Sequence, residues 1–303
     1  MKKLILIIVL CAFCAPMIFA QDSIPAAPEK KPLTKAPFES GICMDMITVS
    51  SPPSAKTLEF VLQHRFGVMN TEDDGTSIWN DLFGIWGASN IRMGLNYSIT
   101  PDVVVGFGTT KNKRYQDFSV KYTFLKQRDQ GFPLTMAYYF NLAINASDKS
   151  NFGMDYKFID RLTYYHELMV ARRFSRMFSA QASLNFSHFN KADSLNDVIG
   201  INLIGRVKVS PQTSVVVSYS APLVQGYDEP FIIPYGREWY YFNDMSKQNF
   251  NIGVEISTST HCFHIFVGAS QGIIPQEMAR YNGNDFFKGE IVLGFNMTRL
   301  WNF

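Results

Sequence analysis

The sequence predicts an all-β protein: a closed antiparallel transmembrane β-barrel of about 12 strands. Apolar and polar residues alternate along most segments after residue 56, which is the pattern of strands with two unlike faces. Longer and shorter connections tend to alternate between these segments, as in outer-membrane barrels. Although 47% of the 303 residues are apolar, the mean hydropathy is close to zero. Beyond the first 20 residues, no apolar run is long enough for a membrane helix.

The alternation places the strands in chain order. Apolar residues occupy every second position from Leu134 to Ile144, with polar or small residues such as Thr135 and Asn141 between them. The expected strands are residues 57–67, 90–99, 102–110, 116–126, 133–145, 161–174, 176–189, 198–210, 213–221, 247–257, 260–270 and 287–300. Every proline after residue 56 falls in an expected turn, in a loop or at a first strand position, because proline cannot donate to a strand ladder.

The connections give the strands a direction. Those after every second strand are short, such as Thr100-Pro101 and Pro211-Gln212, whereas the ninth strand is followed by a loop from about Pro222 to Ser246. In outer-membrane barrels the short turns are periplasmic and the long loops external. An even number of strands then leaves both ends of the barrel on the periplasmic side. The terminal Phe303 resembles the aromatic signal that bacterial barrels present to their assembly machinery.

Three regions are expected along the chain. Residues 1–20 have the basic start, apolar centre and small cleavage residue of a secretory signal peptide. Residues 21–56 form a proline-rich periplasmic leader and a candidate plug segment, and residues 57–303 form the barrel. We therefore expect export through the periplasm to the bacterial outer membrane.

The charge balance excludes one class of partner. Without the two lysines of the signal peptide, the chain carries 26 basic and 26 acidic residues. A nucleic-acid partner would require a basic excess, so none is expected. Neither a phosphate-binding loop nor a dinucleotide fingerprint is present, and we expect no cofactor. The expected partners are outer-membrane lipid, the assembly machinery and a small solute.

Several motifs resemble a known family. They include Leu58-Glu59-Phe60, His64-Arg65-Phe66-Gly67, and the stretches at residues 88–95, 167–174 and 288–296. Together they resemble an uncharacterised outer-membrane β-barrel family of Bacteroidota, a domain of unknown function, over about residues 38–300. The resemblance implies a barrel and carries over no functional residue. It also implies O-glycosylation of Asp-Ser/Thr-apolar sites, of which Asp193-Ser194-Leu195 is one, with Ser194 as the acceptor.

Much of the strand charge lies on the stripes that we expect to face the lumen. A closed, mutually paired lumen and a narrow polar passage both remain open as interpretations, because 12 strands lie between a filled barrel and an open pore. The candidate lumen-lining residues are Glu59, Gln63, Arg65, Arg92, Lys121, Glu167, Arg173, Arg206, Lys208, Glu255, His264 and Glu290.

The segment before the first strand is unusually apolar for a periplasmic tail. Residues 38–56 include Ile42, Met44 and Val49, so we expect the segment to fold into the lumen as a plug. Cys43 lies in it, and Cys262 lies near the periplasmic start of the eleventh strand. Two readings remain: isolated thiols, or a Cys43–Cys262 disulfide that pins the plug.

Two outer loops are rich in aromatic residues, which either pack against the barrel rim or form a vestibule for an apolar or ring-shaped ligand. The candidate loop residues are Trp79, Trp86, Tyr235, Trp239, Tyr240 and Tyr241.

The histidines do not define a catalytic or metal site in the sequence. His64, His166 and His188 fall on the lipid-facing stripe, and we find no serine placed beside His166 for a lipid-facing hydrolase. In the cluster His261-Cys262-x-His264 the first residue points away from the other two, so only two ligands share a face. We expect neither a catalytic residue nor a metal site.

The sequence therefore favours a narrow passive channel or a small-solute binding and uptake protein of the outer membrane. The alternative is a non-conducting structural or interaction partner of an envelope complex. A lipid-facing hydrolase ranks third.

Overall fold

The computed structural model describes residues 35–52, 54–70, 82–190, 197–223 and 246–303, and the backbone of 231–232 and 239–240. All of these residues belong to one compact unit, Leu33–Phe303. No helix among them is long and apolar enough to cross a membrane.

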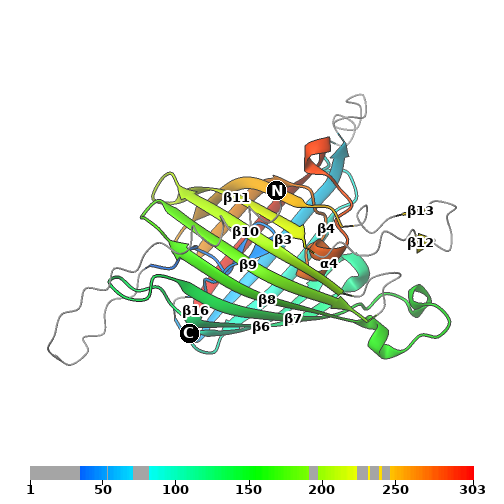
Figure 1. Cartoon of the computed structure of the whole chain (residues 1–303), viewed down its shortest axis with the longest axis horizontal. Coiled ribbons are helices and arrows are strands. Elements are labelled where there is room, and N and C mark those ends of the chain that lie inside the picture. The colour runs from blue at the N-terminus through cyan, green and yellow to red at the C-terminus, as the bar shows by residue number, and fades with distance from the viewer. Residues whose placement is uncertain are drawn as a thin grey trace. The chain divides into compact units, whose positions relative to one another are not determined.

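Twelve strands close an antiparallel barrel in which each strand pairs with the next along the chain, and the last pairs with the first (Figure 1). The predicted fold class is therefore confirmed. The barrel strands are β3 (Thr57–Asn70), β4 (Asn90–Ser98), β5 (Val103–Thr110), β6 (Gln116–Leu125), β7 (Thr135–Ile144), β8 (Leu162–Arg173), β9 (Phe178–Phe189), β10 (Asp197–Lys208), β11 (Thr213–Pro222), β14 (Asn249–Ser257), β15 (His261–Gly268) and β16 (Glu290–Asn302).

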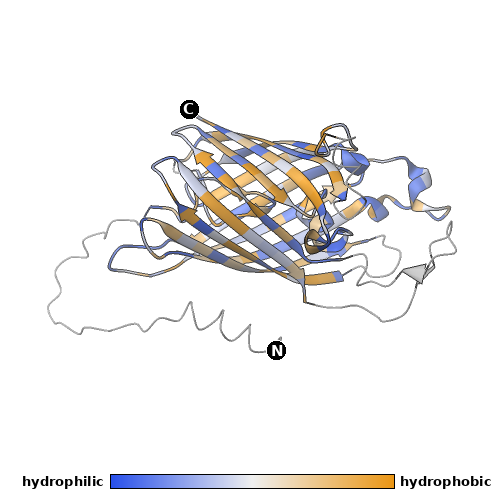
Figure 2. Ribbon diagram, turned by 90° about the horizontal axis from the view of Figure 1, so that it is seen from above, coloured by the Kyte–Doolittle hydropathy of each residue, from blue (hydrophilic) through white to orange (hydrophobic). Residues whose placement is uncertain are grey.

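The alternating residues of the sequence face opposite sides of the barrel wall. Burial alternates at every one of the 14 residues of β3, and Figure 2 shows hydrophobic and hydrophilic positions alternating along the strands. Large apolar side chains remain exposed on the outer wall, whereas charged and amide side chains are buried on the inner wall. The exposed outer-wall residues include Met93, Leu95, Phe107, Phe118, Val120, Tyr122, Leu168, Leu184, Ile252 and Ile265.

The connections at the two ends of the barrel differ in length. The short-turn end carries the connections at residues 99–102, 126–134, 174–177, 209–212 and 258–260. Opposite, at the loop end, lie the helical elements of the described residues (Figure 1). They are η1 (Asn112–Arg114), η2 (Lys149–Phe152), η3 (Phe158–Arg161), α4 (Pro275–Arg280) and η4 (Phe286–Lys288), and the pair β12 (Phe231–Ile232) and β13 (Trp239–Tyr240) also falls in a loop there.

A small hairpin precedes the barrel in the chain. Its strands β1 (Ile42–Cys43) and β2 (Met46–Ile47) pair antiparallel, with Cys43 opposite Met46. The turn holds Met44 at a φ of 50°, a conformation that non-glycine residues seldom adopt. Because the Met44 side chain is fully buried, packing offsets the strain of this turn.

Candidate functional site

The candidate site is the barrel lumen, which is crossed by residues 35–52, called here the hairpin segment. Its contacts reach inward-facing residues around the whole wall. Asp45 binds β3 and β14, the backbone of Ile47 and Val49 binds β9, and Glu39 binds β10. The hairpin segment is therefore bound to inward-facing residues of β3, β9, β10 and β14.

The tip of the hairpin is held by an ion pair. Arg65 donates from Nε to Asp45 Oδ1 over 2.9 Å, and Asn249 Nδ2 donates to Asp45 Oδ2 over 3.1 Å. Arg65 also donates to Asn296 Oδ1, and its guanidinium lies 4.7 Å from the centre of the Phe266 ring. Since both ionic side chains are buried, each charge depends on the other for compensation.

Gln181 of β9 binds the hairpin as a neighbouring strand would. Its Nε2 donates to the carbonyl of Ile47 over 2.8 Å, and its Oε1 accepts from the amide of Val49 over 2.9 Å. On the other side of the lumen, Lys121 Nζ donates to the carbonyls of Thr48 and Ser50. These side chains satisfy backbone groups that would otherwise be unpaired in the barrel.

A second buried ion pair lies on the wall itself. Arg92 donates to both carboxylate oxygens of Asp117, at 2.9 and 2.6 Å, and to Gln63 Oε1 at 3.1 Å. The guanidinium occupies the space above Gly108, where a Cβ atom would lie 2.2 Å from Arg92 Nη2. Glycine at this position therefore makes room for the bidentate pair.

Two further carboxylates of the wall accept hydrogen bonds from amides and a hydroxyl. Glu59 Oε2 accepts from Asn96 Nδ2 over 2.9 Å. Glu167 Oε1 accepts from Asn202 Nδ2 over 2.7 Å and from the Ser183 hydroxyl. Such buried carboxylates require these donors, because burial of an unpaired charge is costly.

Charges on β10 engage the start of the hairpin segment. Arg206 Nη2 and Lys208 Nζ lie 3.2 and 3.5 Å from Glu39 Oε1, and Lys35 Nζ donates to the same oxygen over 2.9 Å. Burial alone would raise the pKa of Glu39. The hydrogen bond from Lys35 and the three nearby cations outweigh it and hold that pKa below its usual range.

Both cysteines are buried free thiols in the structure, which corresponds to the first of the two readings that the sequence left open. Cys43 faces other partners: Glu255 and His264, whose ligand atoms and the Cys43 Sγ all lie within 4.8 Å of one another. Burial, together with the Glu255 charge, raises the pKa of the Cys43 thiol well above its usual value. In the sequence, only His261, Cys262 and His264 are neighbouring candidates for a metal site. The fold brings Cys43 and Glu255, which are remote in sequence, next to His264.

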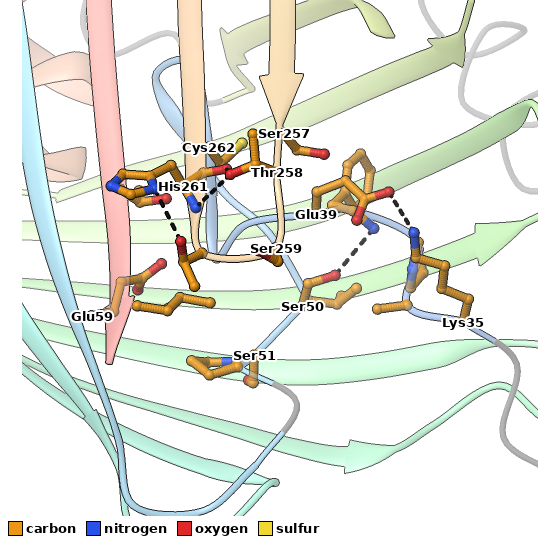
Figure 3. A pocket seen from close by; sticks show the side chains of 18 of the residues that line it. Lys35, Glu39, Ser50, Ser51, Glu59, Ser257, Thr258, Ser259, His261 and Cys262 are labelled. Atoms are coloured by element: carbon orange, nitrogen blue, oxygen red, sulfur yellow. Dashed lines mark hydrogen bonds and ion pairs between the residues drawn. The ribbon is translucent and has the colours of Figure 1, made fainter. Parts of the chain in front are cut away.

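A cavity of about 650 Å³ opens on the short-turn side of the hairpin segment. Figure 3 shows Lys35, Glu39 and Ser50 of the hairpin segment on one side of it and, on the other, the end of β14, the turn and the start of β15, where Ser257, Thr258, Ser259, His261 and Cys262 are labelled. Two smaller cavities, of about 50 and 10 Å³, lie between the hairpin, the barrel wall and α4. The hairpin segment thus separates the large cavity, called here the vestibule, from the much smaller cavities next to α4.

Residues 269–289, called here the lid, cover part of the loop end. Gln276 of α4 donates to Asn141 Oδ1 on β7 over 2.7 Å, and Glu277 Oε1 accepts from Asn112 Nδ2 over 2.9 Å. Burial raises the pKa of Glu277 to about 7, although Lys113 at 3.8 Å acts to lower it. Because α4 also contacts β8 to β11, the lid lies across the mouth of the barrel.

The candidate lumen residues occupy two kinds of position. Arg173, Lys208 and Glu290 are half-buried near the ends of their strands, with Arg173 binding the carbonyl of Ser175 and Glu290 lying 3.6 Å from Lys247. The buried members are Glu59, Gln63, Arg65, Arg92, Lys121, Glu167, Arg206, Glu255 and His264.

Most of the loop candidates lie outside the side chains that the structure describes. Trp79, Tyr235, Tyr241 and the glycosylation candidate Ser194 lie outside the described residues. Trp239 and Tyr240 form β13, of which only the backbone is described, so the aromatic vestibule and the glycosylation stay predictions. Trp86 is 75% exposed.

The outward histidines are surrounded by aromatic rings. His166 Nδ1 lies 2.6 Å from the Tyr138 hydroxyl, and its ring lies beside those of Phe140 and Phe186. His188 binds Asp197 and Asn190. A ring with a polar tip in such surroundings suits the membrane–water interface.

A closed barrel with an apolar outer wall and a polar inner wall is a membrane-spanning β-barrel, the architecture of bacterial outer-membrane proteins. The chain belongs to the family described as "Membrane bound beta barrel domain", whose model matches residues 38–301. No curated protein matches the sequence.

Several solved outer-membrane proteins are similar in structure. An outer-membrane channel from Pseudomonas putida F1 gives a TM-score of 0.48 at 11% identity, covering 84% of this chain and 98% of the other. The NanC porin gives 0.47 at 7% identity, covering 80% and 98%. The KdgM porin gives 0.44 at 6% identity, also covering 80% and 98%.

Sequence reasoning missed several residues of the site. Asp117 lies on the same inward stripe as Lys121, so strand alternation was a sufficient signal for it. Alternation also gives the inward direction of Gln181 on β9, but not its hairpin partners more than 130 residues away. Asp45 had no such signal, because it lies outside the alternating strands and its partner Arg65 is 20 residues away.

Proposed function

We propose that this protein is a small-solute channel of the outer membrane that the hairpin segment holds closed. The observation that carries the proposal is the vestibule of about 650 Å³, which ends at the hairpin segment and is lined there by charged and hydroxyl side chains such as Glu59, Lys208 and Thr123. The inner wall beyond the hairpin carries further charges, such as those of Arg92 and Glu167. Displacement of the hairpin would extend a polar passage along the wall.

The contacts of the hairpin support a plug that can move. The tip and both edges are bound by hydrogen bonds and ion pairs, as with Arg65, Lys121 and Gln181. Water can replace these partners, so each bond contributes only about 0.5–1.5 kcal/mol net, or about 1.5–3 kcal/mol where a charge takes part. A lumen wetted after displacement would therefore keep its polar groups satisfied.

Planar-bilayer conductance of the full chain tests the proposal. We expect rare single-channel openings of the wild type, and more frequent ohmic openings of Asp45→Asn, which removes the charge that holds the tip. Asp102→Asn is the matched control, because Asp102 pairs with Lys126 at the exposed short-turn end. Absence of conductance in Asp45→Asn, with a hairpin shown to be released by alkylation of Cys43, would refute the channel.

A second candidate is a non-conducting structural or interaction protein of the envelope. Apolar packing favours it: Phe38, Met44 and Val49 of the hairpin segment form one buried cluster with wall residues that include Met169 and Phe266. Release of this cluster would expose apolar surface to water, which opposes opening. The same conductance experiment separates the two candidates.

We further propose that the protein is not an enzyme and that its partners are lipid, the barrel-assembly machinery and a solute. The hydrogen bond described for His166 goes to Tyr138, a phenol among aromatic rings, which supports an interfacial rather than a catalytic role. The motifs at residues 88–95 and 167–174 support an origin in Bacteroidota, as a resemblance.

A further inference from the structure

We propose that Cys43, Glu255 and His264 form a Zn²⁺ site in the lumen that joins the hairpin to the barrel wall. The Cys43 Sγ, a Glu255 carboxylate oxygen and a His264 ring nitrogen all lie within 4.8 Å of one another. All three side chains are buried, and they come from β1, β14 and β15. The site exists only when the hairpin is seated.

Two of the donors are brought together by the barrel itself. Glu255 and His264 are direct partners in the β14–β15 register, and His264 Nε2 lies 3.3 Å from Glu255 Oε2. Side chains of directly opposed residues on one face of an antiparallel pair lie close together. The hairpin then adds Cys43, the last residue of β1.

An independent observation points to a missing ligand. His264 is 0% exposed, yet its Nδ1 has no hydrogen-bond partner among the described residues, and its Nε2 and Glu255 Oε2 have only their 3.3 Å contact with each other. Buried polar atoms are nearly always satisfied in native proteins, so a buried imidazole and carboxylate oxygen with no partner except each other require an explanation. A cation between them supplies the missing interactions.

The donor types suit zinc. Thiolate sulfur, imidazole nitrogen and carboxylate oxygen are its usual ligands, whereas Ca²⁺ and Mg²⁺ prefer oxygen alone. Bonds of about 2.0–2.3 Å require the three atoms to approach by small side-chain movements. Binding forms a Zn–Sγ bond while the thiol proton of Cys43 leaves to solvent.

The surroundings resemble the outer shell of a metal site. Arg206 Nε donates to Glu255 Oε1 over 2.7 Å, which leaves Oε2 turned toward His264. Ligating carboxylates in metal sites are commonly oriented in this way. Cys262, two residues before His264 on the same inward face, lines the cavity of about 650 Å³ and marks an entry route from the short-turn end. A water or Cys262 would complete four-fold coordination.

Metal binding to the full chain, refolded in detergent and stripped with a chelator, tests the site without reference to conduction. We expect one Zn²⁺ per chain, and binding weakened by more than about tenfold in Cys43→Ser and in His264→Gln. His261→Gln is the matched control: its ring lies against Phe263, outside the cluster, and binding should be unchanged. Equal binding by all variants, or none by the wild type, would overturn the proposal.

A spectroscopic measurement on the wild-type protein tests the site even if the variants do not fold. Co²⁺ added to the wild-type protein should give a thiolate-to-cobalt charge-transfer band and the visible bands of a tetrahedral site. Excess Zn²⁺ should remove both. Since Cys43 and Cys262 are the two cysteines outside the expected signal peptide, a band that persists in Cys262→Ser assigns the thiolate to Cys43. A wild-type spectrum without the charge-transfer band excludes a cysteine ligand and overturns the site.

Discussion

Arg65 of β3 and Asp45 at the tip of the hairpin form an ion pair with Nη2 and Oδ1 2.5 Å apart and side chains 0% and 1% exposed. This pair joins the plug to the strand that closes the barrel, because β3 pairs with β16 on one side and β4 on the other. Removing one partner of a buried pair leaves the other charge uncompensated, so the hairpin and the barrel wall are energetically coupled.

Asp45→Asn should loosen the hairpin. Loss of the partner of a buried charge costs up to about 3–5 kcal/mol. The Cys43 thiol should then react with a maleimide more than about tenfold faster in chelator-treated protein, since 1.4 kcal/mol corresponds to a factor of ten. Asp102→Asn, which removes an exposed pair worth about 0–1 kcal/mol, should leave the rate unchanged. An unchanged rate in Asp45→Asn would show that apolar packing alone seats the hairpin.

Gly108→Ala should destabilise the barrel. The added methyl group would meet Arg92 Nη2 at 2.2 Å and displace the guanidinium from Asp117. Forcing atoms into a packed site costs about 1–3 kcal/mol. Gly205→Ala on β10 is the matched control, because nothing lies within 4 Å of its new Cβ. Urea titration of the folded barrel in detergent should give a lower midpoint for Gly108→Ala alone, and equal midpoints for both variants would contradict this account of Gly108.

Glu277 should make the stability of the lid depend on pH. Its pKa is raised from 4.5 to about 7, so the folded state binds a proton that the unfolded state has released. Stability from neutral Glu277 is therefore present below pH 4.5 and is lost as the pH rises to about 7, by an amount on the order of 3 kcal/mol. As the pH rises through this window, the urea midpoint of unfolding should fall for the wild type relative to that of Glu277→Gln. Parallel pH profiles would rule out a neutral carboxyl in the lid.

Surface labelling should distinguish the two ends of the barrel. Met154 lies fully exposed in the β7–β8 loop, and Met177 is 60% exposed in the β8–β9 turn. Met154→Cys should react with a membrane-impermeant maleimide on intact cells, whereas Met177→Cys should react only after lysis. Both native cysteines of the barrel unit are buried, so background labelling is low. The reverse result would invert the orientation proposed for the loops.

The strands themselves were predictable because each is a local pattern. Alternation of apolar and polar residues over about ten positions specifies which face of a strand meets lipid, and proline marks the turns. The same alternation identified inward residues such as Arg92 and Glu255, and the apolar residues before β3 indicated that the segment enters the lumen. Charge partners were harder, because Asp117 lies on a different strand from Arg92 and register depends on the whole barrel.

The sequence by itself determined the twelve-stranded antiparallel barrel, its two unlike faces and the polar character of its lumen, because these follow from period and turn spacing. Only the tertiary structure decided which inward groups meet. Closure of β16 on β3 and entry of the hairpin bring Asp45 to Arg65, and bring Cys43 to Glu255 and His264 rather than into a disulfide with Cys262. The physical reason is that a strand's period specifies a direction for each side chain, whereas contact across a lumen depends on register, barrel diameter and the path of the plug.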